Sequence, residues 1–192
     1  LELLGLEFGK FPGEAKIFAP CETGGCYACS LFVNGEPKPA CVTSAQEGMT
    51  INLTLPKDYV PLRRVSGFQP HAVGGVGTPW WIKKSGRHYV EVACFAHGCN
   101  LRCLQCQNYT VTYDNLTPPS TPMEAAAVLT AQRNRYGVDR MAISGGEPTI
   151  NKPWLTRFFQ ELHRLNPDPG ARLHLDTNAT VITPEYVDLL VE

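Results

Sequence analysis

Residues 88–108 read HYVEVACFAHGCNLRCLQCQN, an apolar run that ends in a loop with three cysteines. The apolar residues of 88–95 fill a length typical of strands, so this run predicts a buried strand. Cys99, Cys103 and Cys106 follow it with the spacing C-x3-C-x2-C. Thiolates bind soft metals well, so the stretch predicts a metal-binding loop directly after a strand.

The chain beyond this loop alternates between helix and strand patterns. We expect helices at about 122–136 and 152–165 and from residue 184, with strands at 139–144 and 171–175. Strands that alternate with helices of this length imply βαβ units and a parallel sheet.

Both long helices carry clear local signals. Thr121-Pro122-Met123-Glu124 is a capping box with proline at the first helical position, and Gly137 ends the same helix. Apolar side chains recur at helical spacing in the next helix and predict one buried face: Trp154, Leu155, Phe158, Phe159, Leu162 and Leu165. Core packing explains these aromatic residues better than stacking on a cofactor.

Two further motifs follow the next two predicted strands. Gly145-Gly146-Glu147-Pro148 comes after the second strand, and Asp176-Thr177-Asn178 comes after the third. Functional residues of parallel sheets gather on the loops after the carboxyl ends of the strands. We therefore expect the three motifs to meet at one end of one sheet. For Asp176 and Asn178 the alternative is an ordinary turn, which their side chains also favour.

Together these motifs resemble the radical S-adenosylmethionine (radical SAM) enzymes, and most closely the pyruvate formate-lyase activating enzymes. The resemblance implies that Cys99, Cys103 and Cys106 ligate a 4Fe-4S cluster. Three thiolates hold three corners of such a cluster, and its open iron takes the methionine end of SAM.

The same resemblance implies which residues bind SAM. Gly145, Gly146, Glu147 and Pro148 match the GGEP motif beside the amino group of SAM, and Asp176, Thr177 and Asn178 resemble the DTN near its ribose and methionine. Two positions depart from the pattern. Ala179 stands where the family usually has glycine, and Gln105 stands where an apolar or aromatic residue commonly packs on the adenine.

The activity that follows from this resemblance is reductive cleavage of SAM to methionine and a 5′-deoxyadenosyl radical, which abstracts hydrogen from a substrate. The implied fold is an α/β partial (β/α) barrel, truncated after about three βα units. The implied partners are SAM, an electron donor of the reduced ferredoxin or flavodoxin type, and a substrate that is either a protein or a small molecule.

A separate group of cysteines lies near the start of the chain. Cys21, Cys26, Cys29 and Cys41 have the spacing C-x4-C-x2-C-x11-C, whose first three members match the plant-type 2Fe-2S pattern. We call them the first cysteine set, and Cys99, Cys103 and Cys106 the second cysteine set. Gly24-Gly25 supplies positive φ angles to a loop that wraps a cluster.

A hairpin signal lies between the third and fourth of these cysteines. Leu31-Phe32-Val33 is followed by Asn34-Gly35, a pair typical of type I′ turns, which return the chain so that Cys41 completes the site. The segment resembles the 2Fe-2S ferredoxin domains fused to redox enzymes. The resemblance covers about residues 1–55 and implies an α+β, β-grasp domain whose opening hairpin is missing. A fused 2Fe-2S cluster of this kind would relay electrons to the 4Fe-4S cluster.

Zinc is the alternative metal for both sets. The first set could form a four-thiolate zinc site, and the second could bind zinc with His97 or Cys94 as its fourth ligand. We expect Cys94 to be a small buried hydrophobe and His97 a polar loop residue. Eight cysteines also permit disulfides, but chains without an export signal more often use such spacings for metals.

These assignments predict a domain at residues 1–55, a linker at 56–87 and a catalytic domain at 88–192. The linker is rich in proline, glycine and basic residues. Arg63 and Arg64 within it are expected to be solvated. Gly74-Gly75-Val76-Gly77 is a turn rather than a phosphate loop, and Trp80-Trp81 is expected to pack one domain on the other.

Composition limits the remaining function classes. The chain has 192 residues, of which 43% are hydrophobic, and a net charge of -1. No bias toward nucleic-acid or membrane partners is visible, and exposed clusters would imply a cytoplasmic, anaerobic setting. The chain starts at a leucine and stops within a predicted helix, so we expect a fragment. Two alternative functions remain. One is an iron–sulfur electron-transfer subunit without SAM chemistry, and the other is a zinc-stabilised binding module.

Overall fold

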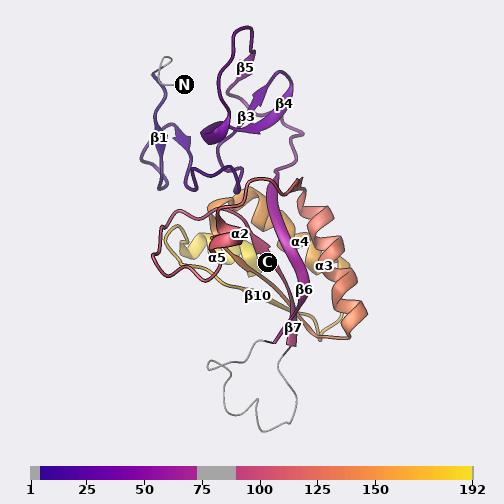
Figure 1. Ribbon diagram of the computed structural model, residues 1–192. Coiled ribbons are helices and arrows are strands. Elements are labelled where there is room, and N and C mark those ends of the chain that lie inside the picture. The colour runs from indigo at the N-terminus through magenta and orange to yellow at the C-terminus, as the bar shows by residue number, and fades with distance from the viewer. Residues whose placement is uncertain (1–4, 73–89, 192) are drawn as a thin grey trace.

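The computed structural model describes residues 5–72 and 90–191. Figure 1 shows the segments before residue 55, in indigo and purple, above a layer of sheet and helices formed by the later part of the chain. We refer to residues 5–55 as the first module. The predicted glycine-rich turn at 74–77 and Trp80-Trp81 lie outside the described residues.

The first module is built from short strands. β1 (Phe8–Gly9) pairs in parallel with β2 (Ile17–Phe18). β3 (Ser30–Val33) lies between β4 (Glu36–Pro39) and β5 (Ile51–Asn52) in an antiparallel sheet, and the 3-10 turn η2 (Ala40–Val42) follows β4.

The predicted hairpin is confirmed. Asn34 and Gly35 connect β3 to β4 with φ angles of 52° and 82°. Positive φ at both central residues is the requirement of a type I′ turn, which matches the twist of the flanking strands. This turn returns the chain to Cys41, as the sequence predicts.

The second layer contains a five-stranded sheet in the order β10-β9-β7-β6-β8. Its strands are β6 (Arg63–Ala72), β7 (Val90–Ala96), β8 (Pro119–Ser120), β9 (Arg140–Gly145) and β10 (Arg172–Leu175). β7, β9 and β10 run parallel, as predicted, whereas β6 is antiparallel to both β7 and β8. The mixed sheet curls into half of a barrel.

The prediction that residues 56–87 are only a connection is wrong, because part of this segment forms strand β6. Its ten residues include Gly67, Pro70 and several polar residues, and its register against β7 shifts between Ser66 and Gln69. Gly67 and Phe68 both have positive φ at this irregularity, 95° and 44°. A bulge interrupts the alternation of side chains between the two faces, so no strand period was visible in the sequence.

The helices are α2 (Tyr109–Thr112), α3 (Pro122–Tyr136), α4 (Lys152–Leu165) and α5 (Pro184–Val191), and the 3-10 turn η3 (Pro148–Ile150) precedes α4. The capping box of α3 is confirmed, because Thr121 Oγ1 accepts from Glu124 N while the Glu124 carboxylate accepts from Thr121 N. Gly137 ends α3 at a φ of 60°.

One core joins the sheet to α3 and α4. The predicted face of α4 is confirmed: Trp154, Leu155, Phe158, Phe159 and Leu162 are buried and Leu165 packs against them. The Trp154 and Phe158 rings stack with centroids 4.8 Å apart. The core thus fixes the helical side of the sheet and leaves the loops after the strands free to form a site.

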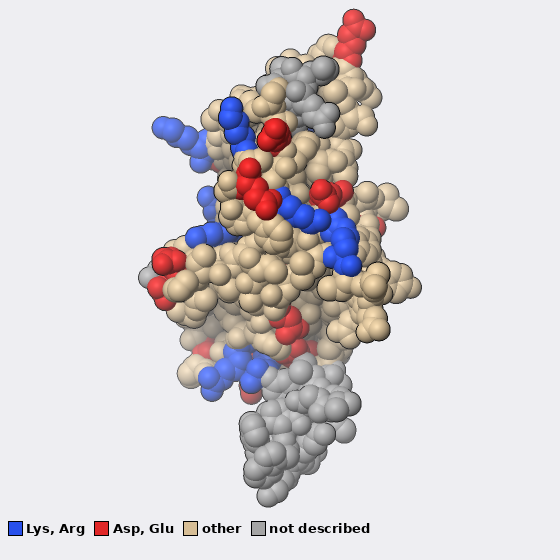
Figure 2. Space-filling model, turned by 90° about the vertical axis from the view of Figure 1, so that its left-hand side faces the viewer, with Lys and Arg blue, Asp and Glu red and all other residues tan. Residues whose placement is uncertain are grey.

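Charges are interspersed on the surface. On the face drawn in Figure 2, basic and acidic side chains stand close to one another and uncharged residues cover most of the area. In the part of the chain that the structure describes, no helix is long and apolar enough to cross a membrane.

Candidate active site

The second cysteine set lies on the loop between β7 and α2. Cys99 and Cys106 are half-buried, and Cys103 is exposed. Cys99 Sγ accepts a hydrogen bond from Leu101 N at 3.4 Å. Burial raises the pKa of the Cys99 thiol. Cys106 Sγ lies 3.9 Å from Thr112 Oγ1. The loop is therefore open on the side of Cys103, where a bound group would meet solvent.

The loop after β9 packs against this loop through its backbone. Gly146 N donates to Ala96 O at 2.7 Å, and Glu147 N donates to Gly98 O at 2.8 Å. A Cβ at Gly146 would lie 2.3 Å from Gly98 O, and one at Gly145, whose φ is 105°, would lie 2.6 Å from Ala96 N. The contact between the two loops thus requires both glycines.

Glu147 connects this loop to the one after β10. Its side chain is fully buried. Oε1 accepts from Thr149 N at 3.0 Å, from Thr149 Oγ1 at 2.6 Å and from Thr177 Oγ1 at 2.7 Å, and Oε2 accepts from Asn178 N at 2.6 Å. A buried carboxylate with four donors is well satisfied, so it holds Thr177 and Asn178 in place.

Asn178 completes the connection to the cysteine loop. Its Nδ2 donates to Asn100 Oδ1 at 3.1 Å and lies 3.7 Å from Cys99 Sγ. The three sequence motifs therefore lie in contact at the carboxyl ends of β7, β9 and β10. Ala179 has a φ of 59°, a conformation that favours glycine. Glycine is the usual residue at this position in the family that the motifs resemble.

Asp176 belongs to a different set of contacts. Its Oδ1 lies 3.1 Å from His174 Nε2, and His174 Nδ1 lies 3.0 Å from Glu91 Oε2. His174 thus links strands β10 and β7 through their side chains and holds one carboxyl oxygen of Asp176. Asp176 itself is exposed at the strand end.

Arg63 is not solvated, contrary to the expectation from the sequence. Its side chain is fully buried. The guanidinium donates to the main-chain oxygens of Pro148 at 2.5 Å, Glu147 at 2.6 Å and His97 at 3.1 Å. A charged donor shared by three carbonyls locks the loop after β9 to the end of β7. Two adjacent arginines in a polar segment gave no signal that one of them would be buried.

The first cysteine set gathers into one buried group. Cys21, Cys26 and Cys29 are buried and Cys41 is half-buried. Cys26 Sγ lies 3.0 Å from Cys21 Sγ. The Cys41 thiol lies near enough to Cys21 and Cys29 to lower the pKa values of both. The four predicted ligands thus lie near one another, although no three of these four described residues surround one point closely enough to hold a single ion.

These contacts divide the thiols into two kinds. Hydrogen bonds from Cys26 and Cys41 lower the pKa of Cys21, and a hydrogen bond from Cys41 lowers that of Cys29. Burial raises the pKa of Cys26, and the hydrogen bonds to Cys21 and Cys29 raise that of Cys41. A buried group of four thiols is a donor set that soft metals favour.

The glycine pair of this loop has two separate roles. Gly24 has a φ of 78°, as the prediction of positive φ requires, but Gly25 does not. A Cβ at Gly25 would instead lie 2.8 Å from both Gly98 N and His97 Cβ. Gly25 therefore permits the loop of the first set to lie directly on the loop of the second.

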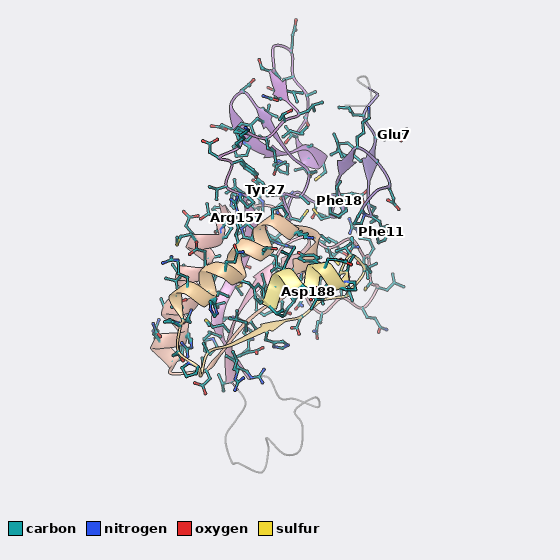
Figure 3. All side chains as sticks on the ribbon, turned by 180° about the vertical axis from the view of Figure 1, so that it is seen from behind. Glu7, Phe11, Phe18, Tyr27, Arg157 and Asp188 are labelled. Atoms are coloured by element: carbon teal, nitrogen blue, oxygen red, sulfur yellow. The ribbon has the colours of Figure 1, made fainter. Side chains whose placement is uncertain are left out.

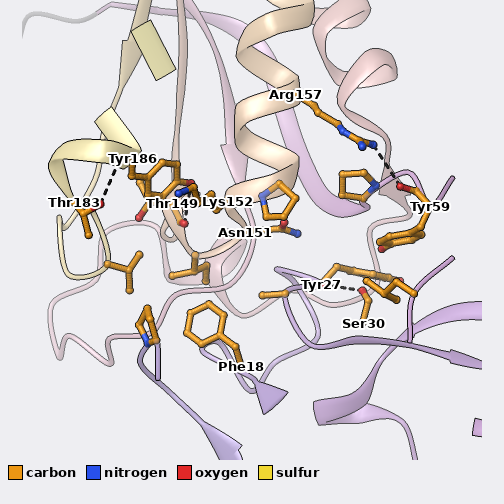
Figure 4. Close-up of a pocket in the computed structure, with 17 residues that line it drawn as sticks. Phe18, Tyr27, Ser30, Tyr59, Thr149, Asn151, Lys152, Arg157, Thr183 and Tyr186 are labelled. Atoms are coloured by element: carbon orange, nitrogen blue, oxygen red, sulfur yellow. Dashed lines mark hydrogen bonds between the residues drawn. The ribbon is translucent and has the colours of Figure 1, made fainter. Parts of the chain in front are cut away.

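A cavity of about 390 Å3 lies where the first module meets the helices (Figure 4). Phe18 and Tyr27 of the first module lie at this junction in Figure 3. Several polar groups in the lining are already occupied. Tyr186 Oη donates to Thr149 O at 3.0 Å, Arg157 donates to Tyr59 O at 3.4 Å, and Lys152 Nζ lies 4.9 Å from the centroid of the Tyr186 ring.

The two residues named as possible zinc ligands are engaged elsewhere. Cys94 is fully buried in the core, and burial raises its pKa to about 12. His97 is buried, with Nε2 2.8 Å from Ser66 Oγ and Nδ1 3.2 Å from Asp114 Oδ2. Among residues 5–72 and 90–191, no three histidine, cysteine or acidic side chains surround one point closely enough to hold a single ion.

Comparison with known proteins agrees with this geometry. A curated relative, the AdoMet-dependent heme synthase of Methanosarcina barkeri (strain Fusaro / DSM 804), is 33% identical over an alignment 101 residues long, which covers 48% of this chain and 25% of the relative. The chain thus spans about a quarter of the length of that relative. Residues 94–192, slightly more than half of the chain, match the radical SAM superfamily. The chain belongs to the radical SAM superfamily.

Proposed function

We propose that Cys99, Cys103 and Cys106 hold the 4Fe-4S cluster that membership of the superfamily implies, and that the loops after β9 and β10 bind SAM beside it. When bound, the cluster and SAM together supply a 5′-deoxyadenosyl radical that abstracts hydrogen from a substrate. The open side of the loop at Cys103 suits a group with one free coordination position.

One observation carries this assignment. The buried Glu147 carboxylate binds Thr177 and Asn178, and Asn178 in turn reaches Asn100 and Cys99. Residues from three distant parts of the sequence are thereby fixed around one spot at the carboxyl ends of three parallel strands. That end of such sheets is where ligands bind.

The residues of the site have different tasks in this proposal. Thr177 and Asn178 are exposed and would contact SAM together with the backbone at Gly145 and Gly146. Glu147 and Pro148 are buried, and their polar groups bind other parts of the chain. They would therefore act as positioning residues. Asp176, held by His174, is placed to accept a hydrogen bond from a hydroxyl group of the ligand.

We further propose that the first cysteine set holds a 2Fe-2S cluster that relays electrons to the second set. The grouping of four buried or half-buried cysteines, with the Sγ atoms of Cys21 and Cys26 3.0 Å apart, supports this ligand set. The direct packing of Gly25 on Gly98 supports a short path between the sets. A reduced ferredoxin or flavodoxin would supply the electrons, and the β-grasp fold and the domain limit at residue 55 remain predictions.

The substrate is proposed only at the level of the activating-enzyme type, a protein or a small molecule. The heme synthase relative is similar to 48% of this chain. That similarity supports SAM chemistry and carries no substrate with it. An electron-transfer subunit without SAM chemistry is the competing function, and it predicts no reaction with SAM.

The test is formation of 5′-deoxyadenosine from SAM by the anaerobically reconstituted chain with dithionite. We expect the wild type to form it, Cys103→Ala to lose the activity, and Cys94→Ala to keep it. Cys94 is the matched control because it is a buried cysteine outside both sets. A reconstituted wild type that contains iron but leaves SAM intact would favour the electron-transfer subunit.

A further inference from the structure

The loops of the two cysteine sets are in close contact at Gly98. A Cβ on Gly98 would lie 2.8 Å from Cys21 Cβ and 3.1 Å from Cys21 Sγ. Cys99 is the next residue after Gly98. Cys21 is therefore the member of the first set whose side chain lies against the second set, with the backbone of Cys26 beside it, and Cys99 is the member of the second set that is next to this contact along the chain.

Arg102 bridges the main chains of these two cysteines. Its Nη1 donates to Cys99 O at 2.7 Å and to Leu101 O at 3.1 Å, and its Nη2 donates to Cys21 O at 2.5 Å. The same Nη2 lies 3.4 Å from the carboxylate of Glu22. Its guanidinium also lies 5.6 Å from the centroid of the Tyr113 ring.

This arrangement is more specific than a surface ion pair. The Arg102 side chain is 38% exposed, so its pairing with Glu22 contributes little by itself. A planar guanidinium with donors on both sides can instead fix two carbonyl groups at one separation. The two carbonyls belong to one proposed ligand from each set, so Arg102 sets how far apart the two metal groups lie.

The charge of Arg102 has a second effect. An added electron on either set is stabilised by a nearby cation, and net charge and hydrogen bonding tune the reduction potentials of iron–sulfur clusters. Arg102 therefore favours the reduced state of both sets while it holds them together. Electron tunnelling slows steeply with distance, so loss of this bridge would also slow transfer.

We propose that Arg102 is the positioning residue for electron transfer between the two cysteine sets, an inference that rests on the proposed function. With both groups bound, one electron would leave the reduced group on the first set, which would be oxidised, and would enter the group on the second set, which would be reduced. No bond breaks and no proton moves. A reduced ferredoxin-type donor replaces the electron on the first set.

The test uses Arg102→Gln and Arg102→Lys in the anaerobically reconstituted chain. After flash photoreduction, we expect electron transfer between the sets to slow by about tenfold in Arg102→Gln, the lower end of the effect of groups that orient metal ligands. Reduction potentials measured by electron paramagnetic resonance should shift to more negative values. Arg102→Lys should keep the potentials close to the wild type and recover only part of the rate, because an ammonium cannot hold both carbonyls in one plane.

Two variants act as controls. Arg164→Gln removes the same charge from an exposed site on α4, where Arg164 pairs with Glu161, and should change neither the rate nor the potentials. Glu22→Gln removes the carboxylate but leaves the carbonyl bonds of Arg102 intact. We expect it to change the rate far less than Arg102→Gln does.

The outcomes separate this inference from the proposed function. If the wild type holds both clusters and Arg102→Gln transfers electrons at the wild-type rate, the inference is wrong and the proposed function stands. If the wild type never acquires iron on the first set, the relay and the inference both fail. Loss of iron from both Arg102 variants would also overturn the inference, because Arg102 would then be needed for assembly rather than positioning.

Discussion

The two cysteine sets differ in how they meet solvent. In the first set three of the four cysteines are buried, whereas in the second Cys103 is exposed and only Cys99 and Cys106 are half-buried. A metal site closed by its own protein ligands has no place for a substrate, and a site with fewer protein ligands keeps an open position. The difference is the one that the proposed function requires, a closed site for electron storage beside an open site for chemistry.

We expect the largest effects from variants that remove one cysteine of either set, because each set should bind its own ligand independently of the other. Cys26→Ala should abolish iron binding by the first set and leave SAM binding at the second intact. Cys106→Ala should abolish SAM binding and leave the first set loaded. Iron analysis and equilibrium dialysis with labelled SAM check both variants, and loss of iron from both sets in either variant would contradict independent sites.

Arg63 should show the next largest effect, because it ties the two loops of the open site together. Arg63→Leu leaves the buried carbonyls of His97, Glu147 and Pro148 without their donor. We expect the free energy of unfolding of the iron-free chain to fall by about 3 kcal/mol or more. Urea titration measures this, with Arg164→Gln expected to stay within about 0.5 kcal/mol of the wild type. Equal stability of the two variants would mean that the buried arginine does not hold the site.

Replacing Asp114 should have a smaller effect on the free energy of unfolding, and this effect should depend on pH. Hydrogen bonds from Thr117 and from Leu116 N lower its pKa to about 2 from the ordinary 3.8, so ionised Asp114 stabilises the folded chain above pH 3.8. This stabilisation is lost as the pH falls toward 2. Asp114→Asn should cost about 1 kcal/mol near neutral pH.

The measurement is urea unfolding of both iron-free proteins at several pH values. The difference between the wild type and Asp114→Asn should shrink as the pH falls below 3.8. A difference that stays constant with pH would show that Asp114 acts through its shape rather than its charge.

Much of the fold could be predicted from the sequence where the signal is local. The capping box at Thr121, the stop at Gly137, the apolar face of α4 and the turn at Asn34-Gly35 all lie where the patterns place them. Each depends on residues that are neighbours in the chain. The spacing of the cysteines predicted a common site for the first set, and within it the Sγ atoms of Cys21 and Cys26 are in contact.

Features that depend on distant contacts could not be predicted. β6 is a strand because it pairs with β7, and its bulge hides the period that a strand shows in sequence. Arg63 is buried because three carbonyls surround it, one from the residue after β7 and two from the start of η3 and the residue before it. The need for Gly25 comes from Gly98, which lies on the other cysteine loop. None of these partners is marked in the sequence around the residue that needs it.

The smallest expected effect concerns strain in the open site. Ala179 has a φ of 59°, which costs energy for a residue with a Cβ. Ala179→Gly should relieve this strain and raise the free energy of unfolding by about 0.5 kcal/mol, since the greater freedom of glycine in the unfolded chain offsets part of the gain. A decrease in stability on urea titration would show that the loop is not strained there.

The most direct test of two separate sets is electron paramagnetic resonance of the dithionite-reduced, anaerobically reconstituted chain, with and without SAM, together with an iron count. The account predicts two signals and about six irons per chain, two on the first set and four on the second, with SAM changing only one signal. A single signal, or two signals that SAM leaves unchanged, would contradict a closed electron store beside an open SAM site.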